Sequence, residues 1–233
     1  MLLVAVVMGG VALFIAQYLQ MVLELSPLNA GLWMIPQALG MILGSSLIPV
    51  LAKRYRPSYI ITIGLAISTM GMLLITFMPN IGGLSFIVTG FVLSVIGVSP
   101  VLVLGTGIII GSAPEEKAGA ASSISETSNH LGVALGVAIL GSIGSFIYHI
   151  TIEKHLPYYL SKESQHAVRE SIIGAHYVVS TLNVEQGATL LASAKMAYIS
   201  GFRIISGVGA LIFAFSLLFV ALKFRNVKTA EAL

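Results

Sequence analysis

The feature that most constrains the fold is a long uncharged segment: residues 57–114 contain no Asp, Glu, Lys or Arg. A membrane-spanning helix needs about 20 predominantly apolar residues, so this segment holds two spans joined by a turn at residues 79–83. Hydrophobic residues make up 57% of the chain and charged residues only 9%, which excludes a soluble domain. The same criterion gives six candidate spans, at residues 1–23, 30–52, 59–78, 84–110, 118–148 and 198–222.

The sequence therefore predicts an all-α membrane protein with three parts. Residues 1–149 hold the first five spans, 150–197 form an external loop, and 198–233 hold the last span and a cytoplasmic tail. In the loop, apolar residues recur at helical spacing from Val168 to Leu182, and a second helical run follows at 188–197. We expect an amphipathic helical hairpin, which either gates the outward opening or lies passively at the membrane surface.

Basic residues predict the orientation, because short cytoplasmic loops are enriched in Lys and Arg. The connections at 24–29 and 79–83 carry none. The expected cytoplasmic segments carry Lys53, Arg54, Arg56, Lys117, Lys223, Arg225 and Lys228. We expect a multi-pass protein of the cell inner (plasma) membrane with a cytoplasmic C-terminus. This bias accounts for the net charge of +3, so no nucleic-acid partner is implied.

A polar stripe runs along the fifth span and contains an acid, Glu126. At about 100° per residue, four polar side chains fall within about 60° of it: Ser122, Ser123, Asn129 and His130. An ionisable group inside a span marks a transport pathway or proton relay by default. The alternative is a helix end that lies outside the lipid, with a solvated stripe. We expect Ser122, Ser123 and Asn129 to line a cavity.

Other residues in the spans have structural interpretations. Pro100 is expected to kink the fourth span and to border the cavity. Residues 112–115 resemble a capping box for the fifth helix, and Arg203 is expected to extend to the external surface. Small residues let helices approach closely in lipid, either as ordinary packing or as a sliding surface. Those of the fifth span are Gly132, Gly136, Gly141 and Gly144.

The sequence contains no motif that is typical of an enzyme or of a cofactor site. The chain has no H-E-x-x-H, G-x-S-x-G or G-x-x-x-x-G-K-[ST] pattern. It has no Cys, and His155, His166 and His176 share no ligand spacing, so no metal is expected. Met1 starts directly in apolar sequence without a basic flank, which we interpret as a chain that begins part-way through a longer protein or at an internal start.

Two segments carry a family resemblance: QYLQMVLELSPLNAGLWMIPQALGMILGSSLIPVLAKRYRP and SAPEEKAGAASSISETSNHLGVALGVAILG. They resemble the C-terminal half of a major facilitator superfamily transporter, in the fourteen-span drug:proton antiporter family that includes quaternary-ammonium and biocide exporters. The resemblance implies that six spans form one half and that an N-terminal half is the partner. It also implies a small-molecule cationic substrate, protons as the coupling ion, and membrane lipid as the surroundings.

The same resemblance implies roles for two residues. Glu126 matches an acid that drug-exporting relatives use for proton coupling or cation recognition. Some of them carry a second acid one turn later, where this chain has His130. His130 either takes part in coupling or simply hydrogen-bonds Glu126 or Asn129.

Three functions are consistent with these observations. The first is a proton-coupled exporter of lipophilic cationic drugs, active when joined to an N-terminal half. The second is a truncated membrane fragment or assembly subunit that transports nothing. The third is a six-span transporter that dimerises.

Overall fold

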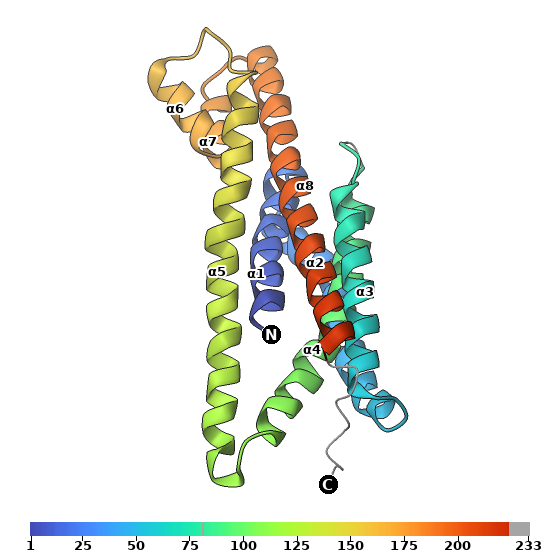
Figure 1. Ribbon diagram of the computed structural model, residues 1–233. Helices are drawn as coiled ribbons and strands as arrows, with labels where there is room; N and C mark the ends of the chain where they lie inside the picture. Colours follow the sequence, from blue (N-terminus) through green and yellow to red (C-terminus); the bar gives the residue numbers. More distant parts are fainter. Residues whose placement is uncertain (81, 224–233) are drawn as a thin grey trace.

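The computed structural model describes residues 1–80 and 82–223, and these residues contain helices and no strand (Figure 1). A short π-helical segment, η1 (Tyr18–Val22), continues α1, and a 3-10 turn (Glu115–Lys117) precedes α5. The α-helices are α1 (Leu2–Gln17), α2 (Pro27–Ala52), α3 (Pro57–Thr76), α4 (Leu84–Gly111), α5 (Ala118–Glu153), α6 (Lys162–Glu170), α7 (Ile172–Val179) and α8 (Val184–Lys223).

The six predicted spans are present, because six helices in the described part of the chain are long and apolar enough to cross a membrane. The last span differs at its start: α8 begins at Val184, where the sequence predicted 198. Residues 188–197 are therefore the first turns of α8 and no separate hairpin helix. They contain no Gly or Pro and are rich in Ala and Leu, so nothing interrupts the helix.

The hairpin consists instead of α6 and α7. The sequence pattern predicted one helix through Val168–Leu182, but the chain turns at Ser171, whose backbone is extended. The Ser171 hydroxyl accepts a hydrogen bond from the Gly174 amide at 3.1 Å and caps α7.

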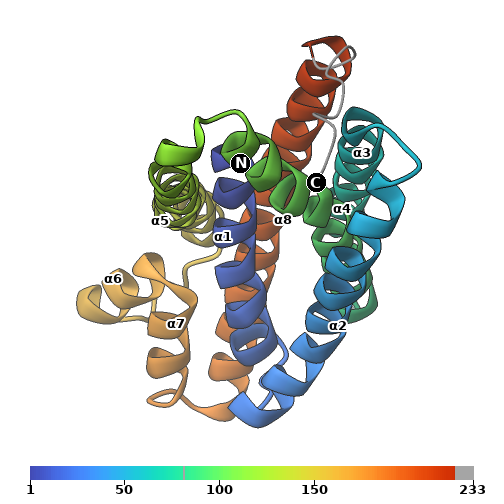
Figure 2. The same cartoon turned by 90° about the horizontal axis from the view of Figure 1, so that it is seen from below.

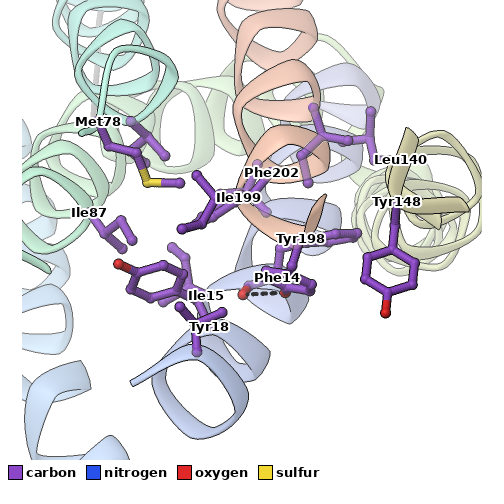
Figure 3. Close-up of a cluster of buried hydrophobic side chains, with 14 of the residues drawn as sticks. Phe14, Ile15, Tyr18, Met78, Ile87, Leu140, Tyr148, Tyr198, Ile199 and Phe202 are labelled. Atoms are coloured by element: carbon purple, nitrogen blue, oxygen red, sulfur yellow. Dashed lines mark hydrogen bonds between the residues drawn. The ribbon is translucent and has the colours of Figure 1, made fainter. Parts of the chain in front are cut away.

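Helices α1 and α8 lie at the centre, with α5 on one side and α2, α3 and α4 on the other (Figure 2). An aromatic cluster joins the two central helices (Figure 3). The Phe14 ring lies 5.5 Å from that of Tyr198 and 6.1 Å from that of Phe202. The buried Tyr198 hydroxyl donates a hydrogen bond to the Phe14 carbonyl at 2.8 Å. This bond satisfies a polar group that would otherwise be costly at this depth.

Small residues bring the α3 and α4 backbones together. A Cβ atom built on Gly64 would lie 2.4 Å from the Gly97 carbonyl, and one on Gly90 would lie 2.6 Å from that of Gly71. Between these pairs, the Ser68 hydroxyl donates a hydrogen bond across the contact to the Ser94 carbonyl at 3.0 Å. Close backbone approach and interhelical hydrogen bonds are the main sources of helix association in lipid.

Helix α4 bends in its second half, where Pro100 stands, and its last turns run toward the start of α5 (Figure 1). Pro100 is buried, and a Cβ on Gly64 of α3 would lie 2.8 Å from its ring. The bend carries the end of α4 away from α8. We call the end of the bundle that holds residues 53–56 the basic end, and the opposite one, with α6 and α7, the hairpin end.

Polar contacts fasten the α6–α7 hairpin. The Arg169 guanidinium donates to both carboxylate oxygens of Glu153 at 2.5 and 2.8 Å, linking α6 to α5. The Tyr148 hydroxyl donates to the Val168 carbonyl at 3.0 Å, and the His176 Nε2 lies 2.8 Å from the Met21 carbonyl oxygen of η1. The hairpin therefore contacts the ends of both α5 and α1.

A second ion pair joins α8 to Glu24, two residues after η1. The Lys195 Nζ donates to the Glu24 carboxylate at 2.6 Å, and Glu24 has a φ of +54°, which is uncommon outside glycine. The hydrogen bond from Lys195 lowers the pKa of Glu24. Because the folded-state pKa is lowered, the pair stabilises the fold above the ordinary Glu pKa, and this contribution is lost as the pH falls through the lowered value.

Arg203, which the sequence suggested would extend to the external surface, is half-buried. Its Nε donates to the Met78 carbonyl at 3.0 Å, just beyond the end of α3. The last carbonyl groups of a helix lack partners within it, and a cation there also favours the negative end of the helix dipole. Arg203 therefore ties α8 to the end of α3.

The contact between α1 and α5 generates a prediction. A Cβ on Gly136 would lie 2.0 Å from the Val6 carbonyl, whereas one on Gly141 would meet nothing within 4 Å. We expect Gly136→Leu to force α1 and α5 apart and to lower the melting temperature of the detergent-purified protein by about 4–8 °C. Gly141→Leu is the matched control and should melt within about 1 °C of the parent. Equal melting of the two variants would contradict the close contact.

Candidate functional site

The polar stripe lies on a face of α5 that no described helix covers. The buried face of α5 repeats every four residues, from Gly132 through Gly136 and Leu140 to Tyr148. Glu126 follows the buried Ser125 by one residue, so it stands about 100° around the helix from that face. Ser122 and Ser123 are exposed and Asn129 is half-buried. The stripe and the packed face are therefore different sides of one helix.

Glu126 and His130 contact each other. The His130 Nε2 lies 3.1 Å from the Glu126 Oε1, and the side chains are 75% and 70% exposed respectively. The i, i+4 spacing on a helix brings the two groups together. Glu126 forms no other hydrogen bond or ion pair within the described part of the chain. Nothing else in residues 1–80 and 82–223 fixes this pair.

The depth of Glu126 follows from helix lengths. At about 1.5 Å per residue, α5 is about 54 Å long, against about 30 Å for the hydrocarbon core of a bilayer. The stretch between His130 and His149, residues 131–148, is about 27 Å long, and Glu126 precedes it by about 7 Å toward the basic end. The carboxylate therefore lies toward the basic end of the apolar part of α5.

The start of α5 differs from the expected capping box. The Ser112 hydroxyl donates back to the Ile108 carbonyl at 2.6 Å, and neither α5 nor the 3-10 turn before it has a side-chain cap. Pro114 begins this turn instead, which leads into α5 at Ala118. The stripe thus begins one turn into a helix whose start is set by backbone geometry.

The four glycines of α5 do not share one environment. A Cβ on Gly132 would lie 2.7 Å from the Leu2 carbonyl of α1, and one on Gly144 would lie 2.3 Å from the Phe14 ring. Gly136 is equally close to α1, and Gly10 of α1 faces it in turn. Gly141 faces open space. Three of the four positions therefore border α1, and the fourth does not.

A cavity of about 500 Å³ lies elsewhere in the described chain. It is lined by residues of α1, α3, α4 and α8 at the basic end. None of the predicted cavity-lining residues borders it: Ser122, Ser123, Asn129 and Pro100. The stripe is an open surface in this chain, and Pro100 is buried against α3.

One polar group that sequence reasoning passed over is Gln37 of α2. Its Oε1 is buried and has no hydrogen-bond donor among the described residues. It lies beside Trp33 of α2 and Phe91 of α4, in a small apolar recess. In the sequence, the feature that singles out Gln37 is that it is the one amide within the apolar segment WMIPQALGM. A buried acceptor without a partner is uncommon and is available to a ligand or a water.

Comparisons with known proteins identify the family. The model of the Major Facilitator Superfamily matches residues 1–137. The multidrug efflux pump LfrA of Mycolicibacterium smegmatis is 33% identical over 217 residues, which is 93% of this chain and 43% of the pump. The methyl viologen resistance protein SmvA of Salmonella typhimurium is 30% identical over 82% of this chain and 38% of its own length. The multidrug resistance protein Stp of Mycobacterium tuberculosis is 29% identical, over 63% and 27%.

The chain spans less than half the length of these relatives. The matching region includes α1 to α4 and most of α5, with the whole polar stripe. The relatives are transporters and resistance proteins, and the six spanning helices agree with that class. This chain belongs to the Major Facilitator Superfamily, a family of membrane transporters and not of enzymes.

Proposed function

We propose that this chain is the C-terminal half of a proton-coupled efflux transporter for lipophilic cationic compounds. The observation that carries the proposal is the Glu126–His130 pair, an ionisable pair on a face of α5 that no described helix covers. Relatives named as a multidrug efflux pump and a methyl viologen resistance protein support efflux as the activity.

The uncovered face of α5 argues for a second half. Ionisable groups in spanning helices face the bundle interior or a water-filled cavity, because exposure to lipid is costly. Glu126 has apolar neighbours on the same helix, Ile124 and Leu131, which are also exposed. Helix α2 is likewise mostly exposed, so two helices present faces that their own chain does not cover. An N-terminal half placed against α2 and α5 would cover these faces and leave Glu126 beside the path between the halves.

The chemistry of the pair fits exchange of a proton for a cation. A carboxylate binds either a proton or a cationic group, so the two ligands compete for one site. His130 at 3.1 Å stabilises the ionised carboxylate when the imidazole is charged and accepts or donates a single hydrogen bond when it is neutral. Glu126 is therefore the exchanging group, and His130 orients it through their contact.

The same basic residues that predict orientation lie at one end of the bundle. Lys53, Arg54 and Arg56 stand between α2 and α3, and Lys117 stands between α4 and α5. We assign this end to the cytoplasm and the α6–α7 hairpin to the outside. Arg225, Lys228 and the C-terminus lie outside the described residues.

The first prediction concerns orientation. A reporter inserted directly after Arg56 should lie in the cytoplasm, and one inserted within 181–187 should lie outside. The measurement is a pair of reporters that are active on opposite sides of the membrane, each tested at both positions. Two insertions on the same side would rule out the six-span arrangement.

The second prediction concerns sufficiency. Because the transport path needs two halves, the 233-residue chain alone should give no ethidium efflux above empty-vector cells. Co-expression with the N-terminal half of a related exporter should restore efflux, with membrane insertion verified in both cases. Robust efflux by the chain alone would favour a dimerising six-span transporter, in which a second copy covers the open face of α5.

The third prediction concerns Glu126. In the complete two-half protein, Glu126→Gln removes the exchangeable proton at nearly constant shape, and we expect a fall of about 100-fold in cation efflux driven by a pH gradient. His130→Gln should have a smaller effect, because the carboxylate remains. The measurement is substrate efflux from vesicles against an imposed pH gradient, normalised to protein level.

Ser123→Ala is the matched control on the same stripe, since its hydroxyl donates only to the Gly119 carbonyl of its own helix. It should export at the parent rate. Parent-like export by Glu126→Gln would show that the carboxylate is structural, whichever rate His130→Gln gives.

A further inference from the structure

The cavity at the basic end is a candidate ligand site that lies apart from the polar stripe. It has a volume of about 500 Å³ and opens between the starts of α1 and α3 and the ends of α4 and α8. Its inner wall includes the buried Ile61 and Leu65 of α3 and Val101 of α4. Its rim includes Phe215 and Phe219 of α8, which are 63% and 51% exposed. The cavity therefore has a closed floor and an open mouth.

The bend in α4 accounts for this space. Beyond Pro100 the helix turns toward the start of α5, while α8 continues straight to Lys223 (Figure 1). Gly105, in the bent part, lines the cavity and adds no side chain to it. The volume lies within the range of about 300–1,000 Å³ that is typical of small-molecule sites.

The lining has the chemistry of a hydrocarbon site. Ser58 and Ser216 are the only residues with polar side chains among the described residues that line it. The Ser216 hydroxyl already donates to the Ile212 carbonyl at 2.8 Å. Sites for drug-sized ligands carry a few polar groups that fix the ligand's orientation, and this lining offers only the two serines for that role. An unbranched apolar chain needs none.

The mouth of the cavity carries positive charge. Arg56 directly precedes Pro57, which lines the cavity, and it is the residue before the first turn of α3. Lys223 follows Phe219 by four residues and Val220 by three, so it stands one helical turn beyond both lining residues. Neither Arg56 nor Lys223 forms an ion pair within the described chain. The acids at this end, Glu115 and Glu116, belong to the α4–α5 connection beside α5.

We propose that this cavity binds one acyl chain of an anionic phospholipid, with the lipid phosphate held by Arg56 and Lys223. Basic residues at the membrane surface attract anionic headgroups, and an apolar cleft between helices directly beneath them accepts the attached hydrocarbon. A lipophilic cation fits the apolar lining but is repelled at the mouth by charges of its own sign. The bound lipid would contact α3, α4 and α8 together and stabilise the bent end of α4.

Filling the cavity tests the proposal. A Cβ on Gly105 would lie 3.5 Å from the Met1 side chain, an ordinary contact, so a larger side chain enters the cavity without a clash. A Cβ on Gly107, two residues further along α4, would meet nothing within 4 Å, and this residue does not line the cavity. Gly105→Leu and its matched control Gly107→Leu therefore change the same helix equally.

The experiment uses the full-length protein as the cell makes it. After purification in detergent, native mass spectrometry measures the amount of phosphatidylglycerol that stays bound. We expect Gly105→Leu to lower bound phosphatidylglycerol about tenfold and Gly107→Leu to leave it within about twofold of the parent. Circular dichroism verifies that both variants keep the parent helix content. Unchanged binding by a folded Gly105→Leu, or equal loss in both variants, would overturn the proposal.

Charge at the mouth is tested separately. Arg56→Gln combined with Lys223→Gln should weaken phosphatidylglycerol binding about tenfold or more, while leaving the weaker binding of phosphatidylcholine unchanged. Lys154→Gln with Lys162→Gln removes the same charge at the hairpin end and should change neither. Equal retention of the two lipids by the parent protein would mean that the headgroup is not recognised. Displacement of the lipid by ethidium at low concentration would show a drug site instead.

Discussion

The fold depends on how closely helix backbones approach one another. Lipid tails are as apolar as Leu or Ile, so burying such side chains between helices gains little, and close packing and interhelical hydrogen bonds hold the bundle together. The α1–α5 contact at Gly10 and Gly136 is of this kind, and so is the α3–α4 contact between Gly64 and Gly97. With α1 held against α5 and α3 against α4, α8 completes the bundle through the ring contacts of Tyr198 and Phe202 with Phe14.

This constraint determines which face of α5 remains for function. The helix places its small residues against α1, so its polar residues must point about 100° away from that contact. A side chain at Gly136 would clash with the Val6 backbone, so the small residues fix which face of α5 meets α1. Packing inside the chain and exposure of the acid are therefore two consequences of one arrangement. The glycines of α5 have no side chain to take part in chemistry, but their contact with α1 fixes the direction in which Glu126 points.

Hydropathy and periodicity predicted the spans and the stripe, because both depend on the local order of residues. The break at Ser171 was not visible, since the apolar spacing around it fits one continuous helix and a serine can either cap or continue. The contact of Arg203 with the Met78 carbonyl depends on the approach of α3 to α8, which no local pattern contains. The same holds for the cavity, which exists because four helix ends meet around a bend. Exposure of Glu126 likewise depends on which helices are present to cover it.

The helices are held together by different interactions at the two ends of the bundle. At the hairpin end, the Glu153–Arg169 and Glu24–Lys195 ion pairs join α5 to α6 and the end of α1 to α8. At the basic end, the described parts of α1, α3, α4 and α8 meet around apolar side chains, with no ion pair between them. Both ion pairs are partly exposed to solvent, so each adds little to stability and serves mainly to orient the helices that it joins. Apolar surfaces separate at less cost when lipid can take their place. The basic end, which is also the end nearer to Glu126, is therefore held by apolar contacts rather than by ion pairs among the described residues.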